Sequence, residues 1–196
     1  SIVGHAPSDR ACGIQGAAIH GCCSQVAAVA DDAGAAAFAA ELTQQRHDYA
    51  PFNLLFGVAN DMYCYHSPRN QLTRLRPGVH VLCNGLPDAP WPKSERLRGW
   101  LSALARMPAE EVMLDWLADR TPAPVEQLPN TGVGMAREKF LSPVFIAGDD
   151  YGTRASTLLT LSAQGRGLLL ERQYHAGRPQ GSRRLNFSVQ PAARRP

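Results

Sequence analysis

The sequence predicts a single α+β domain in which antiparallel sheets carry a layer of helices. Helical patterns come first along the chain, and short apolar runs separated by glycine-containing turns come last. Elements in that order favour helices packed on an antiparallel meander. The chain has 196 residues, of which 44% are hydrophobic and 19% charged. This is enough for one hydrophobic core, and it argues against general disorder.

The first helix is expected over 31–46. Asp31 and Asp32 offer an N-terminal cap, and the alanine-rich stretch that follows places Phe38 and Leu42 four residues apart on one face. Pro51 disfavours helical geometry in the residue before it, so the helix must end ahead of that point.

Strands are expected next, over 52–58, 62–66 and 78–83. The first two are joined by a turn at Asn60-Asp61, which indicates a hairpin. The third delivers the chain to Asn84-Gly85, a pair that readily adopts positive φ.

Two more helices follow, over 93–107 and from Pro108 onward. In the first, apolar residues recur at helical spacing, at Leu97, Trp100, Leu101 and Leu104. In the second, carboxylates occupy the positive first turn. After a proline-rich surface connection, four consecutive strands are expected, over 140–146, 155–161, 168–174 and 185–189.

Composition excludes several classes of protein. Five cysteines are an odd number without paired zinc-ligand spacing, so neither a disulfide scaffold nor a metal site is expected. No apolar run is long enough for a membrane span, no export signal is visible, and a cytoplasmic location is expected. Six arginines and no carboxylate follow Glu171. Because few aromatic residues lie among them, a solvated basic face is expected rather than nucleic-acid binding.

Residues 1–30 differ from the rest of the chain. They hold three of the five cysteines among glycine and alanine, without helical or alternating periodicity. A poorly ordered lead-in is expected there, or a segment read out of frame. The domain is expected over 31–190, with a basic tail at 191–196.

Three blocks of sequence carry a resemblance to a known family. The first is Tyr49-Ala50-Pro51-Phe52-Asn53-Leu54-Leu55, and the second runs from Gly78 to Lys93 and contains the pattern Asn-x-x-x-Asp-x-Pro-Trp-Pro-Lys. The third runs from Leu128 to Gly134 and leads to residues 142–146 and to Tyr151-Gly152-Thr153-Arg154-Ala155-Ser156-Thr157. In this order the chain resembles the NRDE protein family, also called the transport and Golgi organisation family, from about residue 31 to about 174.

The resemblance implies an αββα sandwich of the N-terminal nucleophile hydrolase type. In that fold a cysteine directly after the initiator Met attacks, with its own α-amine as base. This chain has neither a Met-Cys start nor an Asn-Arg-Asp-Glu run. We therefore expect an incomplete, N-terminally truncated sandwich that lacks its first strands and is inactive by itself. An uncovered sheet edge would then favour self-association.

Four residues are candidates for the site. Asn84 follows a strand and is a candidate oxyanion donor, because a side-chain amide can stabilise developing negative charge; the alternative is a turn residue. Arg154 is a candidate for binding a carboxylate by two hydrogen bonds, or else an edge arginine paired with a nearby aspartate. Trp91 is a candidate ligand wall or a packing residue. Asn53, in the first block, is assigned with them to substrate binding.

Other residues are less suited to a site. Ser1 imitates a processed nucleophile but matches no family position. Cys64 and Cys83 are expected to be small core residues.

Two functions remain open at this stage, and whether the chain is an enzyme is undecided. The first is an amidohydrolase of the N-terminal nucleophile class. The second is a carrier without catalysis, since the family is linked to haem handling and to lipid homeostasis. A groove lined by Trp91, Tyr63 and Tyr65, with Arg154 at its mouth, would suit a small or amphipathic ligand. No cofactor is expected, except that haem is a candidate ligand, with His66 or His80 on its iron.

Overall fold

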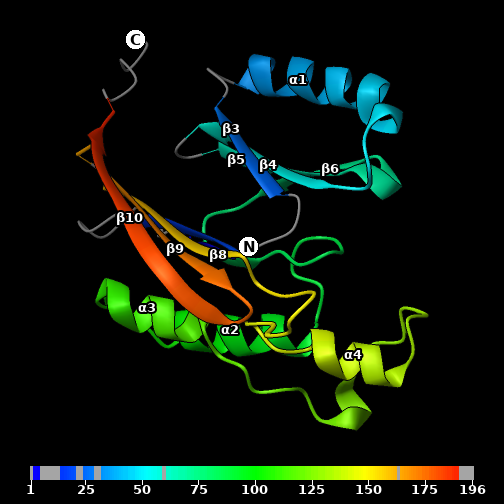
Figure 1. Ribbon diagram of the computed structural model, residues 1–196. Helices are drawn as coiled ribbons and strands as arrows, with labels where there is room; N and C mark the ends of the chain where they lie inside the picture. Colours follow the sequence, from blue (N-terminus) through cyan, green and yellow to red (C-terminus); the bar gives the residue numbers. More distant parts are fainter. Residues whose placement is uncertain are drawn as a thin grey trace.

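Two β-sheets are stacked between helices that cover both outer faces (Figure 1). The computed structural model describes residues 2–4, 14–20, 24–28, 32–58, 61–162 and 164–189. Helix α1 lies over one sheet, and α2 and α3 lie beyond the other, so the layers run helix, sheet, sheet, helix. The expected α+β class is confirmed.

The larger sheet has six strands in the order β10-β9-β8-β2-β1-β7, and all of its neighbours are antiparallel. Its strands are β1 (Ile2–Gly4), β2 (Ile14–His20), β7 (Val79–Val81), β8 (Ala155–Ser162), β9 (Arg166–His175) and β10 (Arg178–Ser188). The last three form the expected meander.

The smaller sheet has four strands in the order β3-β4-β5-β6. They are β3 (Ser24–Ala28), β4 (Asn53–Val58), β5 (Asp61–His66) and β6 (Gln71–Leu75). Pairing is antiparallel except between β3 and β4, which run parallel and are connected through α1. Such a crossover needs a helix-length connection, which a hairpin cannot provide.

Four α-helices are described, with short 3₁₀ turns at 46–48, 67–69 and 125–127. The helices are α1 (Asp32–Gln45), α2 (Pro92–Ser102), α3 (Glu110–Leu117) and α4 (Met135–Leu141). Helix α2 ends five residues before the expected 107. At its C-terminus the amide of Ala103 donates to Gly99 and Leu101 carbonyls, and that of Leu104 to Leu101.

The core divides according to which sheet each helix covers. Helix α1 packs small residues on β4 and β5, in a cluster formed by Ala35, Ala39, Leu54, Phe56 and Tyr65. Helices α2 and α3 pack aliphatic residues on β7, β8 and β9, in a cluster formed by Val81, Leu97, Met113, Leu114, Leu117, Val144, Leu158, Leu168 and Leu170. Leu55 and Cys64, which alternate with the first cluster along β4 and β5, pack instead with Leu82, which follows β7. Alternate residues of a strand face opposite sides, so these contacts join the two sheets.

The prediction that residues 1–30 form a lead-in outside the fold is wrong for the part described here. Strands β1 and β2 lie inside the larger sheet, between β8 and β7, and β3 pairs with β4. The expectation of a sandwich that lacks its first strands stays a prediction. Strands β1, β2 and β3 are defined by pairing with their neighbours, which a search for alternation within one segment does not detect.

The prediction of a strand over 140–146 is also wrong. Its first residues belong to α4, and the remainder is a loop in which Val144 and Phe145 are buried. Pro143 has no N–H to give to a ladder, and the amide of Phe145 donates to the Asp119 carbonyl. The helix over 135–141 and strand β6 were not expected. The basic tail at 191–196 lies outside the described residues.

Candidate functional site

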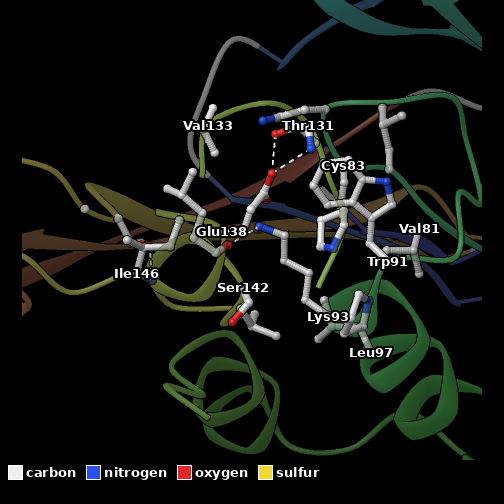
Figure 2. Close-up of a pocket in the computed structure, with 18 of the residues that line it drawn as sticks. Val81, Cys83, Trp91, Lys93, Leu97, Thr131, Val133, Glu138, Ser142 and Ile146 are labelled. Carbon is white, nitrogen blue, oxygen red and sulfur yellow. Dashed lines mark hydrogen bonds between the residues drawn. The ribbon is translucent and has the colours of Figure 1, made fainter. Parts of the chain in front are cut away.

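A cavity of about 240 Å³ opens beside the end of β7, bounded by α2, α4 and three loops (Figure 2). Its walls are mainly apolar. They include Val81, Leu82, Trp91, Pro92, Leu97, Leu117, Pro129, Val133, Leu141, Val144 and Ile146. Polar side chains interrupt this wall, among them Asn84, Lys93, Thr131, Glu138 and Ser142. An apolar wall with placed polar groups is usual for a small-molecule site.

Lys93 brings a positive charge into this cavity. It follows Pro92 in the first turn of α2 and is half-buried, and its Nζ donates to the Leu141 carbonyl at 2.9 Å. Burial lowers the pKa of the ammonium below its usual value, against an opposing effect of the Cys83 thiol. A cation is unfavourable near a helix N-terminus, where the helix dipole is positive. The position is therefore unusual for a lysine.

Glu138 brings a negative charge from the opposite wall. It lies on α4, its residue is 5% exposed, and it lines the cavity. Its Oε1 accepts hydrogen bonds from the Thr131 amide at 2.7 Å and from the Thr131 hydroxyl at 2.6 Å. Gly134 precedes α4 with φ 84° and ψ 151°, a conformation open to glycine, and this sets the helix that carries Glu138.

The loop between β7 and α2 is held by Asp88. Its Oδ1 accepts from the Val81 amide at 2.9 Å, and its Oδ2 accepts from His80 Nδ1 at 2.7 Å. Arg98 donates to it from α2 at 3.1 Å. Partial burial favours a raised pKa for this carboxyl, but the three hydrogen bonds outweigh burial and hold its pKa below its usual range. Asp88 therefore fixes the loop that carries Asn84 and Trp91.

A buried hydrogen-bond chain fixes the adjacent end of β7. His66 Nδ1 donates to Asn53 Oδ1 at 2.8 Å, and Asn53 Nδ2 donates to the Cys83 carbonyl at 2.9 Å. Burial lowers the pKa of His66, with a smaller effect from Arg69 in the same direction, and both effects favour the neutral ring. Cys83 Sγ lies 3.0 Å from Ser94 Oγ.

The loop over 146–153 closes one side of the cavity. The Thr153 amide donates to the Ile146 carbonyl at 2.8 Å, and the Ile146 amide donates to Thr153 Oγ1 at 3.1 Å. A Cβ at Gly152 would lie 2.7 Å from the Ile146 oxygen, so this close approach requires glycine. The Tyr-Gly-Thr block thus has a structural role at the cavity wall.

The four candidate residues separate into two pairs. Asn84 and Trp91 line the cavity. Asn53 does not line it but positions Cys83, and Arg154 is exposed and outside the lining.

Other residues considered from the sequence are also placed. Cys64 is fully buried, and burial, together with the charge of Asp88, raises its pKa to about 12. Cys83 lines the cavity, whereas His66 and His80 do not. Ser1 is outside the described residues.

Lys93 and Glu138 were missed as site residues. A lysine in the first turn of a helix, directly after Trp-Pro, was a usable signal because it opposes the helix dipole. Glu138 had no such signal, since its burial depends on how the loop at Thr131 folds over α4.

The described residues contain neither a metal-binding cluster nor a helix able to span a membrane. In the part of the chain that the structure describes, no group of three or more His, Cys, Asp or Glu side chains is arranged to hold a metal ion. No described helix is both long and apolar enough to cross a membrane.

Comparison with known proteins places the chain. The family "Transport and Golgi organisation 2" matches residues 26–176. The chain belongs to this family. The match starts inside β3 and runs to the turn between β9 and β10, so it contains α1, the whole of the smaller sheet's hairpins and every residue that lines the cavity.

Relatives from two mammals are similar over the same region. A Transport and Golgi organization protein 2 homolog from Bos taurus is 27% identical over 151 residues, which cover 67% of this chain and 54% of the relative. The homolog of the same name from Homo sapiens is 26% identical over 159 residues, covering 72% of this chain and 57% of the relative. The chain thus spans about half the length of these curated relatives.

Proposed function

We propose that this member of the Transport and Golgi organisation 2 family binds a small or amphipathic carboxylic acid in the cavity, as a carrier. The observation behind the proposal is Lys93, a half-buried cation facing an apolar space. Among the described residues, no carboxylate is ion-paired with it. Its hydrogen bond to the Leu141 carbonyl uses one of the three donors of an ammonium.

A bound acid would complete this arrangement. A buried charge is costly unless it is paired and hydrogen-bonded, and a carboxylate supplies both the charge and the acceptors. Trp91 and Leu97 stand beside Lys93 on the wall and offer apolar contact. The cavity, at about 240 Å³, is below the roughly 300–1,000 Å³ usual for drug-sized ligands. It therefore suits a small acid, or the acidic end of a larger one.

Haem is one such larger acid, held by a propionate. The geometry gives no support to His66 or His80 as iron ligands for it. Neither lines the cavity, His66 donates to Asn53, and both nitrogens of His80 are hydrogen-bonded. Haem is therefore kept as a test ligand only because its propionates could pair with Lys93.

The test is a binding titration of the whole chain with haem and with a fluorescent fatty acid. Lys93→Met should weaken binding about tenfold or more, because a charge-assisted hydrogen bond contributes about 1.5–3 kcal/mol. Lys139→Met is the matched control, since Lys139 is an exposed lysine on α4 that does not line the cavity. Equal affinity of the Lys93 variant and the wild type for both acids would refute the carrier proposal.

An amidohydrolase is the second candidate, supported by Asn84 on the cavity wall beside Cys83. Among the described residues, however, no Ser or Cys that lines the cavity is hydrogen-bonded to a histidine or a carboxylate. A panel of simple amides tests this candidate: turnover that falls about 100-fold in Asn84→Ala would support an oxyanion role. No turnover by the wild-type chain would leave the carrier as the better account.

A further inference from the structure

Glu138 has hydrogen-bonding capacity that the fold does not use. Both hydrogen bonds from Thr131 go to Oε1, and no described donor pairs with Oε2. The residue is nonetheless 95% buried, since only 5% of it is exposed, and it lines the cavity. Oε2 is not among the described side-chain atoms that are sealed from solvent without a partner, so it reaches the open space of the cavity, where a ligand can donate a hydrogen bond to it.

Lys93 and Glu138 do not complete each other. They reach the cavity from different helices, α2 and α4, and point toward the same space (Figure 2). Each is anchored by a neutral group, the Leu141 carbonyl for Lys93 and the Thr131 amide and hydroxyl for Glu138. No ion pair joins the two among the described residues. The cavity therefore carries a positive and a negative group separately, both with free hydrogen-bonding capacity.

This pair restricts which acid fits. A ligand with a carboxylate alone would satisfy Lys93, but it would bring a second negative charge close to Glu138 and leave Oε2 without a donor. Like charges in a desolvated site repel strongly, so such a ligand gains little. A ligand with an ammonium next to its carboxylate would satisfy both walls at once and add no net charge.

We propose that the natural ligand of this cavity is an α-amino acid with an apolar side chain, or a molecule that ends in that group. The inference rests on the carrier function proposed above. Lys93 pairs with the carboxylate and Glu138 Oε2 accepts from the ammonium. Leu97, Leu117 and Val144 receive the apolar side chain. Haem, which has carboxylates and no ammonium, is a weaker ligand on this account.

The experiment compares L-phenylalanine with 3-phenylpropanoate by calorimetric titration of the whole chain. The two probes share the carboxylate and the ring, and they differ in the ammonium. The wild type should bind L-phenylalanine about tenfold tighter or more, the effect of one charge-assisted hydrogen bond. Equal binding of the two probes, with both weakened by Lys93→Met, would overturn this inference and leave the carrier function standing. Failure of both probes to bind would remove the carrier function for ligands of this size, and this inference with it.

Glu138→Gln sharpens the test. The substituted amide keeps an oxygen acceptor for Thr131 but replaces the second carboxylate oxygen with an NH₂ donor. The variant should lose the preference for L-phenylalanine and bind 3-phenylpropanoate at least as tightly as the wild type does. An equal loss for both probes would assign Glu138 a purely structural role and overturn the inference. Should the variant fail to fold, as judged by circular dichroism, the wild-type comparison alone decides.

Discussion

The two helix–sheet layers of this molecule are built from different residues, and only one of them borders the cavity. Under α1, small side chains at Ala35 and Ala39 let the helix approach a surface of aromatic rings. Phe56 lies edge-on to Phe38 at 5.0 Å and stacks on Tyr63 at 5.9 Å. Under α2 and α3 the packing is mostly leucine. Aromatic rings pack against one another in the layer under α1, whereas the leucine layer ends at the loops that border the cavity.

The position of the cavity follows from the lengths of the helices that cover the two sheets. Helix α1, with 14 residues, spans its sheet, whereas α2 and α3, with 11 and 8, are shorter and are supplemented by irregular segments. Loops can present backbone amides and carbonyls to a ligand, as a helix flank cannot, and binding residues often lie on them. Stability and binding should therefore respond differently to substitutions in the two layers.

The largest effect is expected in the aromatic layer under α1. Phe56 is fully buried, and Phe56→Ala should lower the free energy of unfolding by about 3–5 kcal/mol, from lost burial and the cavity left behind. Urea denaturation measures this, and acid binding at about 25 °C should be unchanged where the variant remains folded. Val112→Ala, on the exposed side of α3, is the control and should change stability by less than about 0.5 kcal/mol. A change in ligand affinity in the Phe56 variant would contradict the separation of the layers.

Leu117 belongs to both the leucine core and the cavity wall. Leu117→Ala should cost about 2–3 kcal/mol in unfolding free energy, near the low end for a buried leucine, because the lost volume adds to a space that is already present. It should also change the affinity for apolar acids, unlike Phe56→Ala. Leu114→Ala, a fully buried leucine outside the cavity lining, is the matched comparison for stability. Unchanged affinity at Leu117 would show that the ligand lies elsewhere.

Asp88→Asn should have a smaller effect, about 1 kcal/mol, because the side chain is 38% exposed. The pKa of Asp88 is lowered in the folded state, so its contribution to stability is present above the unfolded pKa of about 3.9 and is lost as pH falls through the lower folded value. The stability difference between wild type and variant should be constant from about pH 5 to 7 and shrink below about pH 4. A difference in unfolding free energy between the two proteins that grew as the pH fell would contradict this prediction.

The smallest stability effect is expected at Lys93, where the pH dependence of stability has the same sign as at Asp88 although burial here disfavours the charged form. Its pKa is lowered by burial, so between the folded value and the unfolded value of about 10.4 the unfolded chain binds more protons. Stability must then rise with pH across that range. Denaturation of wild type and Lys93→Met from neutral to alkaline pH should show this rise in the wild type only. An identical pH profile in both proteins would place Lys93 in contact with water.

Much of the fold could be predicted from local pattern. Phe38 and Leu42 marked α1, and the 155–161 and 168–174 runs marked β8 and β9, because each pattern is complete within its segment. The strands within 2–28 could not be found that way, since their definition lies in the partners they pair with. The run at 140–146 was misread because buried apolar residues in a loop have the composition of a strand.

The site could be predicted in part. Asn84 and Trp91 were found because a strand end and a proline-flanked ring are visible in the sequence, and both line the cavity. Asn53 was assigned to substrate binding from its place in the first block, whereas its amide contacts a backbone carbonyl and the residue does not line the cavity. The burial of Glu138 depends on Thr131, seven residues before it, and on the turn at Gly134, four residues before it. It also depends on the other segments that line the cavity. No single segment carries that information.

The hydrogen bond from Asn53 to the Cys83 carbonyl connects the smaller sheet to the end of β7, and so to the cavity wall. Sliding of one sheet over the other would have to break this bond or drag the strand end along with it. A ligand that packs against Cys83 should therefore also restrain the smaller sheet, and hydrogen exchange at β4 and β5 should slow when it is bound.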